Sequence, residues 1–446
     1  MSKVDAQPLA MGQGASVATA EPLKTTAAEQ QQQIDEIGRA DIILGVFSHN
    51  SAGTIANVVR AGQEALVTYF PDNRAVLVNV DGGSRDGGAS VALQSALDRN
   101  SFLQITYPLP RLSIATYGMP GKTAAYQALF GVSARLSARA CAVVDGNISS
   151  FNREWVDALV RPVLEQQFDL VSPCYQRHKY DGPILNGIVY PLTRALYGKR
   201  IRQPVGGDLA FSGTLIDYLM RQPQLDGNTA AFGIDAWIST RACCGNFRLA
   251  QASLGPRTLA QNEPVPEVSA MLADVLGSIL TEMNDTASVW QRIRNSEAVP
   301  SFGSGCEPLA DDNTEHSIDT QPMIESFRLG YQNLKEIWGI VLPPATLVEL
   351  KRMALRIAEN FGFDDVLWAR VIYDFALAYR TRIIDRTHLL LALTPIYLGW
   401  VASYVQSVRE KGPAETQERI EALCLAYEMQ KGYLISRWRW PDRFNP

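Results

Sequence analysis

Two hydrophobic patterns divide the chain. Between about residue 41 and residue 253, short apolar runs alternate with segments whose apolar residues recur three and four positions apart, the spacing of one helix face. The apolar runs predict buried strands at 41–48, 75–80, 140–145, 168–173 and 247–253. Strands that alternate with helices are typical of the α/β class, in which helices cover both faces of a mostly parallel sheet.

A helical pattern replaces the strand pattern after about residue 263. Apolar residues three and four apart predict helices over 271–283, 324–341, 346–362, 364–382 and 415–436. Such stripes pack on one another, so we expect an all-helical second domain that is also a candidate surface for a homodimer. Residues 297–321 show no periodicity and predict a long surface loop.

These patterns give three parts: a flexible N-terminal tail at 1–37, an α/β domain at 38–262 and a helical domain at 263–446. The tail is rich in Ala, Gln, Thr and Glu and has few large apolar anchors. The apolar run 389–405 is interrupted by Thr394, Pro395 and Gly399. We therefore expect a buried helix there rather than a membrane span.

Composition narrows the class of protein. The chain has 446 residues, 46% of them hydrophobic, so it has enough apolar mass for a substantial core. Lys and Arg (41) against Asp and Glu (46) give a net charge of −5, which is no electrostatic footprint for nucleic acid. The six cysteines form no CxxC pair, and the N-terminus has no apolar signal-peptide core. We expect a cytoplasmic protein without a disulfide framework or zinc knuckle.

Polar residues follow three of the predicted strands. The segments are Ser48-His49-Asn50-Ser51, Asp81-Gly82-Gly83-Ser84 and Asp145-Gly146-Asn147. Any one of them is explained as a simple turn, but parallel strands place their carboxyl ends at one edge of the sheet, where ligands bind. Neither GxxxxGK[ST] nor GxGxxG is present, which disfavours an ATPase or a nicotinamide dehydrogenase.

Several motifs together carry a resemblance. They are SHNSAGTIANVV (48–59), VNVDGGSRDGG (78–88), GK (121–122), VVDGN (143–147), QPVGGDLAFSG (203–213) and FGIDAWIST (232–240). This set resembles nucleotide-sugar glycosyltransferases of the GT-A fold, and within it the retaining enzymes that make glucosylglycerate, glucosyl-phosphoglycerate and mannosylglycerate. The similarity extends through WARVIYDFALAYR (368–380) and HLLLALTPIYLGWVASYV (388–405), and so covers about residues 40–410.

The resemblance implies a reaction and a set of site residues. The reaction is transfer of a sugar from a nucleoside diphosphate sugar to a small polyol or hydroxy acid, such as glycerate or a phosphorylated glycerate, with retention of anomeric configuration. The donor would be bound by Ser48, Asn50, Asp81, Ser84, Lys122, Asp145, Asn147 and Arg257. The acceptor would be bound by Arg177, Gly206, Gly207 and Asp208, and the catalytic candidates that orient its hydroxyl are Asp208 and Asp235.

The metal site departs from the pattern of the resemblance. Asp145 and Asn147 stand where these enzymes carry a DxD metal motif, and an amide is a poorer ligand for a hard dication than a carboxylate. The relatives' histidine ligand is absent from LGPRTLAQNEP (254–264), and spacing gives no reason for His178 or His316 to replace it. We therefore expect a weak or absent requirement for Mg²⁺ or Mn²⁺, with Lys122, Arg257 or helix N-termini stabilising the departing diphosphate.

Two other readings stay open. A catalytically degenerate relative would bind a nucleotide sugar or a protein partner without turnover. A nucleotidyltransferase would need a basic glycine-rich loop after the first strand, and Ser51-Ala52-Gly53-Thr54 contains no basic residue.

Overall fold

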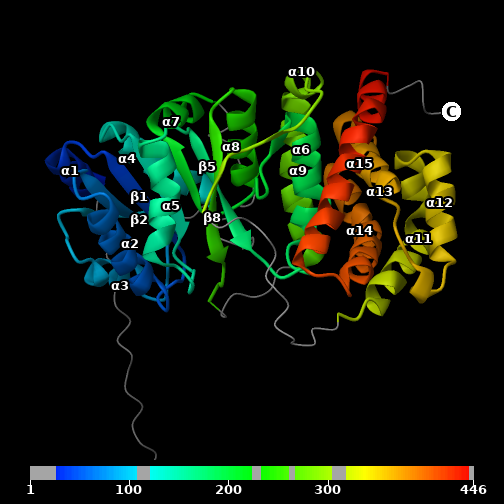
Figure 1. Cartoon of the computed structure of the whole chain (residues 1–446), viewed down its shortest axis with the longest axis horizontal. Helices are drawn as coiled ribbons and strands as arrows, with labels where there is room; N and C mark the ends of the chain where they lie inside the picture. The colour runs from blue at the N-terminus through cyan, green and yellow to red at the C-terminus, as the bar shows by residue number, and fades with distance from the viewer. Residues whose placement is uncertain (1–26, 108–120, 223–232, 261–266, 304–317, 441–446) are drawn as a thin grey trace, which may run out of the picture.

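The computed structural model describes residues 27–107, 121–222, 233–260, 267–303 and 318–440 (Figure 1). An α/β half and a helical half lie side by side along the longest axis of the molecule. The α/β class and the helical second half predicted from the hydrophobic pattern are both confirmed.

The α/β half is built on one sheet. Its eight described strands run in the order β10-β8-β5-β7-β4-β1-β2-β3. Neighbours are parallel except at β7, which is antiparallel to both β4 and β5. The strands are β1 (Ile42–Ser48), β2 (Ala75–Asp81), β3 (Phe102–Thr106), β4 (Ala140–Asp145), β5 (Leu170–Gln176), β7 (Leu209–Ser212), β8 (Leu249–Pro256) and β10 (Ser301–Phe302). All five predicted strands are confirmed, whereas β3 and β7 were not predicted.

Successive side chains of the strands point to opposite faces of the sheet and pack into two separate cores. On β1, Ile43 and Phe47 point to one face of the sheet, while Ile42, Leu44 and Val46 point to the other. The first face is covered by α1 (Ala27–Ile37), α4 (Lys122–Arg135), α7 (Gly213–Met220) and α8 (Gly233–Cys244). The second face is covered by α2 (Ile55–Tyr69), α3 (Gly88–Ser95) and α5 (Arg153–Leu164).

The helical half has its own core. It contains α9 (Val268–Asp285), α10 (Ala287–Trp290), α11 (Gln321–Val341), α12 (Pro344–Ala354), the 3-10 turn η3 (Ala358–Asn360), α13 (Asp365–Thr381), α14 (Arg386–Val408) and α15 (Pro413–Arg439). Two elements from the first half of the chain join it, the π-helical turn η1 (Leu185–Val189) and α6 (Tyr190–Tyr197). This insertion ties the α/β half to the helices.

The junction is fixed at Gly187. Its carbonyl oxygen accepts hydrogen bonds from Trp368 Nε1 at 2.8 Å and from Tyr427 OH at 3.0 Å. A Cβ at this position would lie 2.2 Å from the indole of Trp400, so the close approach of α14 requires glycine. Side chains from three helices of the second half thus hold the π turn in place.

Two sequence predictions are wrong in detail. The helix expected over 346–362 ends at Ala354, because Phe361 and Phe363 leave the helix to pack against Phe327 in the core. The expected loop 297–321 begins with two short strands, β9 (Glu297–Ala298), which pairs with β6 (Lys199–Arg200), and β10, which extends the sheet. The end of the N-terminal tail, residues 27–37, forms α1, whose Ile34 is buried against the sheet.

The long apolar helix α14 packs in the core of the helical half. By length and composition it is the one described helix that qualifies as a membrane span, but 72% of its apolar window is buried inside the protein.

Among the described cysteines, Cys141, Cys243, Cys244 and Cys424 are free thiols and Cys174 is disulfide-bonded, a bond that the cysteine spacing did not predict.

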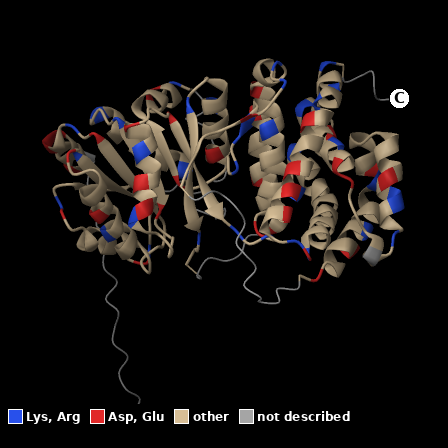
Figure 2. Ribbon diagram, viewed as in Figure 1, with Lys and Arg blue, Asp and Glu red and all other residues tan. Residues whose placement is uncertain are grey.

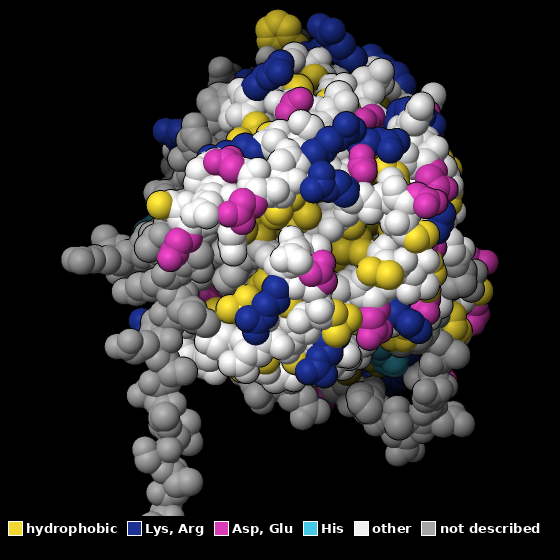
Figure 3. Space-filling model, turned by 90° about the vertical axis from the view of Figure 1, so that its left-hand side faces the viewer, with side chains coloured by type: hydrophobic (Ala, Val, Ile, Leu, Met, Phe, Trp, Pro, Cys, Tyr) yellow, Lys and Arg dark blue, Asp and Glu magenta, His cyan; other side chains and the backbone are white. Residues whose placement is uncertain are grey.

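Charge is spread over the outside of the molecule. Lys, Arg, Asp and Glu lie mainly on the outer helices and loops, and the strands carry few of them (Figure 2). Acidic and basic side chains are interspersed on the face that the α/β half turns outward (Figure 3). Among the described residues of that face, neither sign of charge gathers into a continuous patch.

Candidate functional site

The carboxyl ends of β1 and β2 form one tightly bonded corner. Asp81 is 1% exposed, and its Oδ2 accepts from the backbone N–H groups of Gly83 and Ser84, both at 3.0 Å. Its Oδ1 accepts from Ser84 Oγ and, at 3.5 Å, from Ser48 Oγ. Asp81 therefore shapes the 82–84 loop with the same oxygens that the sequence assigned to a ligand.

Asn50 belongs to the same corner and is exposed. Its backbone N–H donates to Ser84 Oγ at 2.9 Å, and its side-chain Oδ1 accepts from Arg85 N at 2.9 Å. The structure thus brings together four of the predicted donor residues, namely Ser48, Asn50, Asp81 and Ser84.

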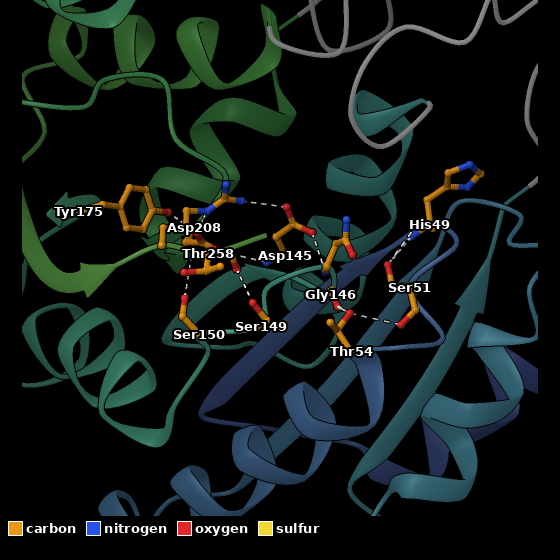
Figure 4. A network of polar contacts seen from close by, with 12 residues as sticks. His49, Ser51, Thr54, Asp145, Gly146, Ser149, Ser150, Tyr175, Asp208 and Thr258 are labelled. Carbon is orange, nitrogen blue, oxygen red and sulfur yellow. Dashed lines mark hydrogen bonds and ion pairs between the residues drawn. The ribbon is translucent and has the colours of Figure 1, made fainter. Parts of the chain in front are cut away.

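The loop after β4 is linked to this corner. Thr54 Oγ1 donates to the Gly146 carbonyl at 2.7 Å, and Gly146 N–H donates to the Phe47 carbonyl at 2.7 Å. Figure 4 shows the polar contacts continuing from Tyr175 through Asp208, Asp145 and Gly146 to Thr54 and Ser51. The three polar loops predicted to converge do lie in one continuous network.

Arg257 bridges two carboxylates at the centre of the network. Its Nη2 lies 2.9 Å from Asp145 Oδ2, and its Nε lies 3.3 Å from Asp208 Oδ2. The loop that carries Arg257 runs along the loop after β4, where Ala260 N–H donates to the Asn147 carbonyl at 3.1 Å and Ser149 N–H to the Thr258 carbonyl at 2.9 Å. This pairing of loops holds the guanidinium against Asp145.

Asp208 is completely buried in this cluster. Its Oδ1 accepts from the Asp145 backbone N–H at 2.9 Å, and its Oδ2 accepts from Tyr175 OH. Burial raises the pKa of Asp208, and the neighbouring charge of Arg257 opposes that rise. Asp208 precedes β7, the strand inserted between β4 and β5, which is why it reaches both Asp145 and Tyr175.

Asp235 lies in the first turn of α8, in a second buried ion pair. Its Oδ2 is 2.6 Å from Lys122 Nζ, and its Oδ1 accepts from Tyr126 OH at 3.1 Å. Burial raises the pKa of Asp235 and Lys122 opposes the shift, while the negative charge of Asp208 raises it further. The two catalytic candidates are thus electrostatic neighbours, each with its own cation.

The glycines before Asp208 allow close packing of the loop. A Cβ at Gly206 would lie 2.5 Å from the ring of Pro173, and one at Gly207 would lie 3.6 Å from Arg257 Nη2. Gly206 therefore lets the loop approach β5, and Gly207 leaves room beside the guanidinium. The role of both glycines in acceptor binding stays a prediction.

A basic pocket lies between the two halves. It encloses about 340 Å³, including space open to solvent, and is lined by β5, η1, the 202–203 segment, α14 and α15. Its basic side chains are those of Arg177, His178, Lys179 and Arg202. Tyr175 joins it to the carboxylate cluster, because its hydroxyl binds Asp208 while its ring lies 5.5 Å below the guanidiniums of both Arg177 and Arg257.

The guanidiniums of this pocket have unused donors. Arg202 Nη2 donates to Asn186 Oδ1 at 2.7 Å, but its Nε and Nη1 have no partner among the described residues, nor has Nε of Arg177. All three nitrogens are buried. Burial lowers the pKa of both arginines. Buried N–H groups without acceptors favour an anionic ligand that supplies them.

Sequence reasoning and structure differ at a few positions. Arg202, Tyr175 and Tyr126 were missed, although Arg202 directly precedes the QPVGGD motif and Tyr175 lies two residues before Arg177. His178 lies in the basic pocket rather than in the carboxylate cluster, and His316 lies outside the described residues. Within the described ranges no group of three or more His, Cys, Asp or Glu side chains is placed to hold a metal ion.

Comparison with known proteins finds similarity only among solved structures. No model of a known protein family matches the chain, and no curated protein matches it. Similar structures include glucosyl-3-phosphoglycerate synthase from Mycobacterium tuberculosis with Mn²⁺, UDP and phosphoglyceric acid, at 23% identity over 59% of this chain and 84% of that chain, with a TM-score of 0.41. The same enzyme with Mn²⁺, UDP and glucosyl-3-phosphoglycerate gives 22% identity, 67% and 94% coverage, and a TM-score of 0.43. Without ligands in its description it gives 21%, 64% and 90%, and 0.40.

These similar structures are of the kind of enzyme that the sequence motifs resemble. Identities of at most 23% and TM-scores below 0.5 support no transfer of residue roles, so function is inferred below from this chain's own side chains.

Proposed function

We propose that this protein is a retaining glycosyltransferase. It moves a sugar from a nucleoside diphosphate sugar to a small hydroxylated acceptor that carries a carboxylate or phosphate, such as glycerate or a phosphorylated glycerate. The observation that carries the proposal is the single polar network that joins the ends of β1, β2, β4 and β7 to Arg257 and lies next to a basic pocket.

The donor half of the proposal follows from the position of the cations. Glycosyl transfer builds negative charge on the departing diphosphate, so fixed cations beside it lower the barrier. Arg257 and Lys122 are both largely buried and both held by carboxylates, which fixes them before the donor arrives. The exposed Asn50 and the 82–84 loop are the proposed contacts for the nucleoside.

The acceptor half follows from the basic pocket. An acidic acceptor would supply the acceptor atoms that Arg177 Nε and Arg202 Nε and Nη1 lack. Its hydroxyl would then point toward Asp208 and Asp235, which we assign to orienting the nucleophile. Because both carboxylates are already paired with a cation, neither is proposed as a covalent nucleophile, and we propose front-face attack with retention.

One assay distinguishes the proposed enzyme from the alternative, a protein that binds a sugar nucleotide without turnover. Transferases without their acceptor usually hydrolyse some donor, so incubation with UDP-, GDP- and ADP-sugars should release the matching nucleoside diphosphate from one class. Binding of a sugar nucleotide with no release, with or without glycerate, would instead identify a degenerate relative. We also propose that the protein is cytoplasmic.

A further inference from the structure

The residues at the expected metal position do not fit a divalent cation. A dication of the Mg²⁺ or Mn²⁺ class takes about six oxygen ligands, with carboxylates preferred. The motif here provides one carboxylate, Asp145, and both of its oxygens are engaged. Oδ1 accepts from Asn147 N–H at 2.9 Å, and Oδ2 is 2.9 Å from Arg257 Nη2.

The other carboxylate within reach is also engaged. Asp208 is 0% exposed, with Oδ1 on the Asp145 backbone N–H and Oδ2 shared between Tyr175 OH and Arg257 Nε. Asn147, at the second motif position, is buried and contributes a neutral amide. A cation entering here would have to displace a guanidinium from two carboxylates at once.

Arg257 itself has the features of a built-in cation. Its side chain is 17% exposed, and two of its nitrogens hold the two carboxylates. The remaining nitrogen, Nη1, has no hydrogen-bond partner among the described residues and is not among the fully buried side-chain atoms that lack one. Arginine keeps its charge at any working pH and suits the geometry of phosphate oxygens.

We infer that Arg257 takes the place of the divalent cation, bridging Asp145 and Asp208 on one side and meeting the donor diphosphate with Nη1 on the other. The inference rests on the proposed function, since it assigns a role toward the diphosphate of the donor. Donor binding and sugar transfer are therefore independent of divalent metal.

The experiment measures calorimetric binding of UDP, GDP and ADP to the full chain in EDTA and in Mn²⁺. The diphosphate that binds should do so with a Kd that differs by less than about twofold between the two conditions. Arg257→Ala should weaken it about ten- to hundredfold in EDTA, the loss expected for a charge-assisted contact, and Arg257→Lys should recover part of it. The exposed Arg248→Ala is the matched control and should bind like wild type.

The outcomes are distinguishable. Wild-type binding that appears only with Mn²⁺ leaves the transferase proposal standing and overturns the role of Arg257, as does unchanged binding by folded Arg257→Ala. No binding of any of the three diphosphates in either condition overturns the proposed function, and the role of Arg257 with it. The wild-type comparison needs no variant, so it decides the question even if Arg257→Ala fails to fold.

Discussion

Replacing Arg177 with methionine should make the protein more stable and should weaken its binding of an acidic ligand. Arg177 lies in the basic pocket with its Nε buried and without a partner, and its guanidinium lies 5.5 Å over the Tyr175 ring. Methionine keeps much of the apolar stem and removes the unsatisfied donor. The same change removes a cation that an acidic acceptor would need.

The two effects have opposite signs and similar origins. A buried N–H without an acceptor costs about 1–3 kcal/mol, and the lost cation–π contact is worth about 0.5–1 kcal/mol. The difference predicts that Arg177→Met raises the free energy of unfolding by about 1 kcal/mol. A lost charge-assisted hydrogen bond of about 1.5–3 kcal/mol predicts that the acceptor binds about ten- to hundredfold more weakly.

The assay combines urea unfolding without ligand and calorimetric binding of glycerate and phosphoglycerate. Arg200→Met, an exposed arginine bonded to Ser296 Oγ, is the matched control and should change neither quantity. If Arg177→Met is less stable than wild type and binds the acids equally well, the guanidinium is a structural group and not a contact for the acceptor.

Two further predictions concern the helical half. Gly187→Ala should lower the free energy of unfolding by about 1–3 kcal/mol in a urea titration, because its Cβ would overlap an indole of α14. In the same titration Gly432→Ala should stabilise α15 by about 0.5–1 kcal/mol, because no heavy atom lies within 4 Å of its Cβ. Asp374 has its pKa raised to about 7 by burial, so the folded state holds its proton more tightly than the unfolded chain, and the free energy of unfolding should fall between about pH 4 and pH 7. In unfolding measured across this range, Asp374→Asn should flatten that fall by up to about 1.4 kcal/mol per pH unit. Asp217→Asn, at an exposed position, should leave the fall unchanged. Equal slopes in wild type and Asp374→Asn would contradict the raised pKa of Asp374.

The hydrophobic pattern did not predict β3 and β7, for two physical reasons. On β3, Gln104 is buried with its Oε1 accepting from Asn79 Nδ2 at 2.9 Å, and this polar residue in the middle of the strand interrupts the apolar run. β7 has four residues and no period long enough to read. The long, strongly periodic helices were predictable because they bury one continuous stripe.

The candidate site shows the same limit. Asp145, Asp208 and Arg257 were each recognisable from motifs, but their contact depends on β7 lying between β4 and β5, an order that the chain does not follow. Arg202 was missed because a lone arginine beside a glycine-rich motif has the sequence signature of a surface residue. Its burial depends on α14 and α15, which are distant in sequence.

Formation of a glycoside is the direct test of sugar transfer by this protein. The full chain is incubated in EDTA with a sugar nucleotide and glycerate or phosphoglycerate, and the anomeric proton of the product is followed by NMR. We expect a new glycoside with the donor's anomeric configuration, formed by wild type and reduced about a hundredfold or more in Asp235→Asn. A sugar nucleotide that binds wild type but yields neither glycoside nor free nucleoside diphosphate, with any acceptor and with or without Mn²⁺, would contradict it.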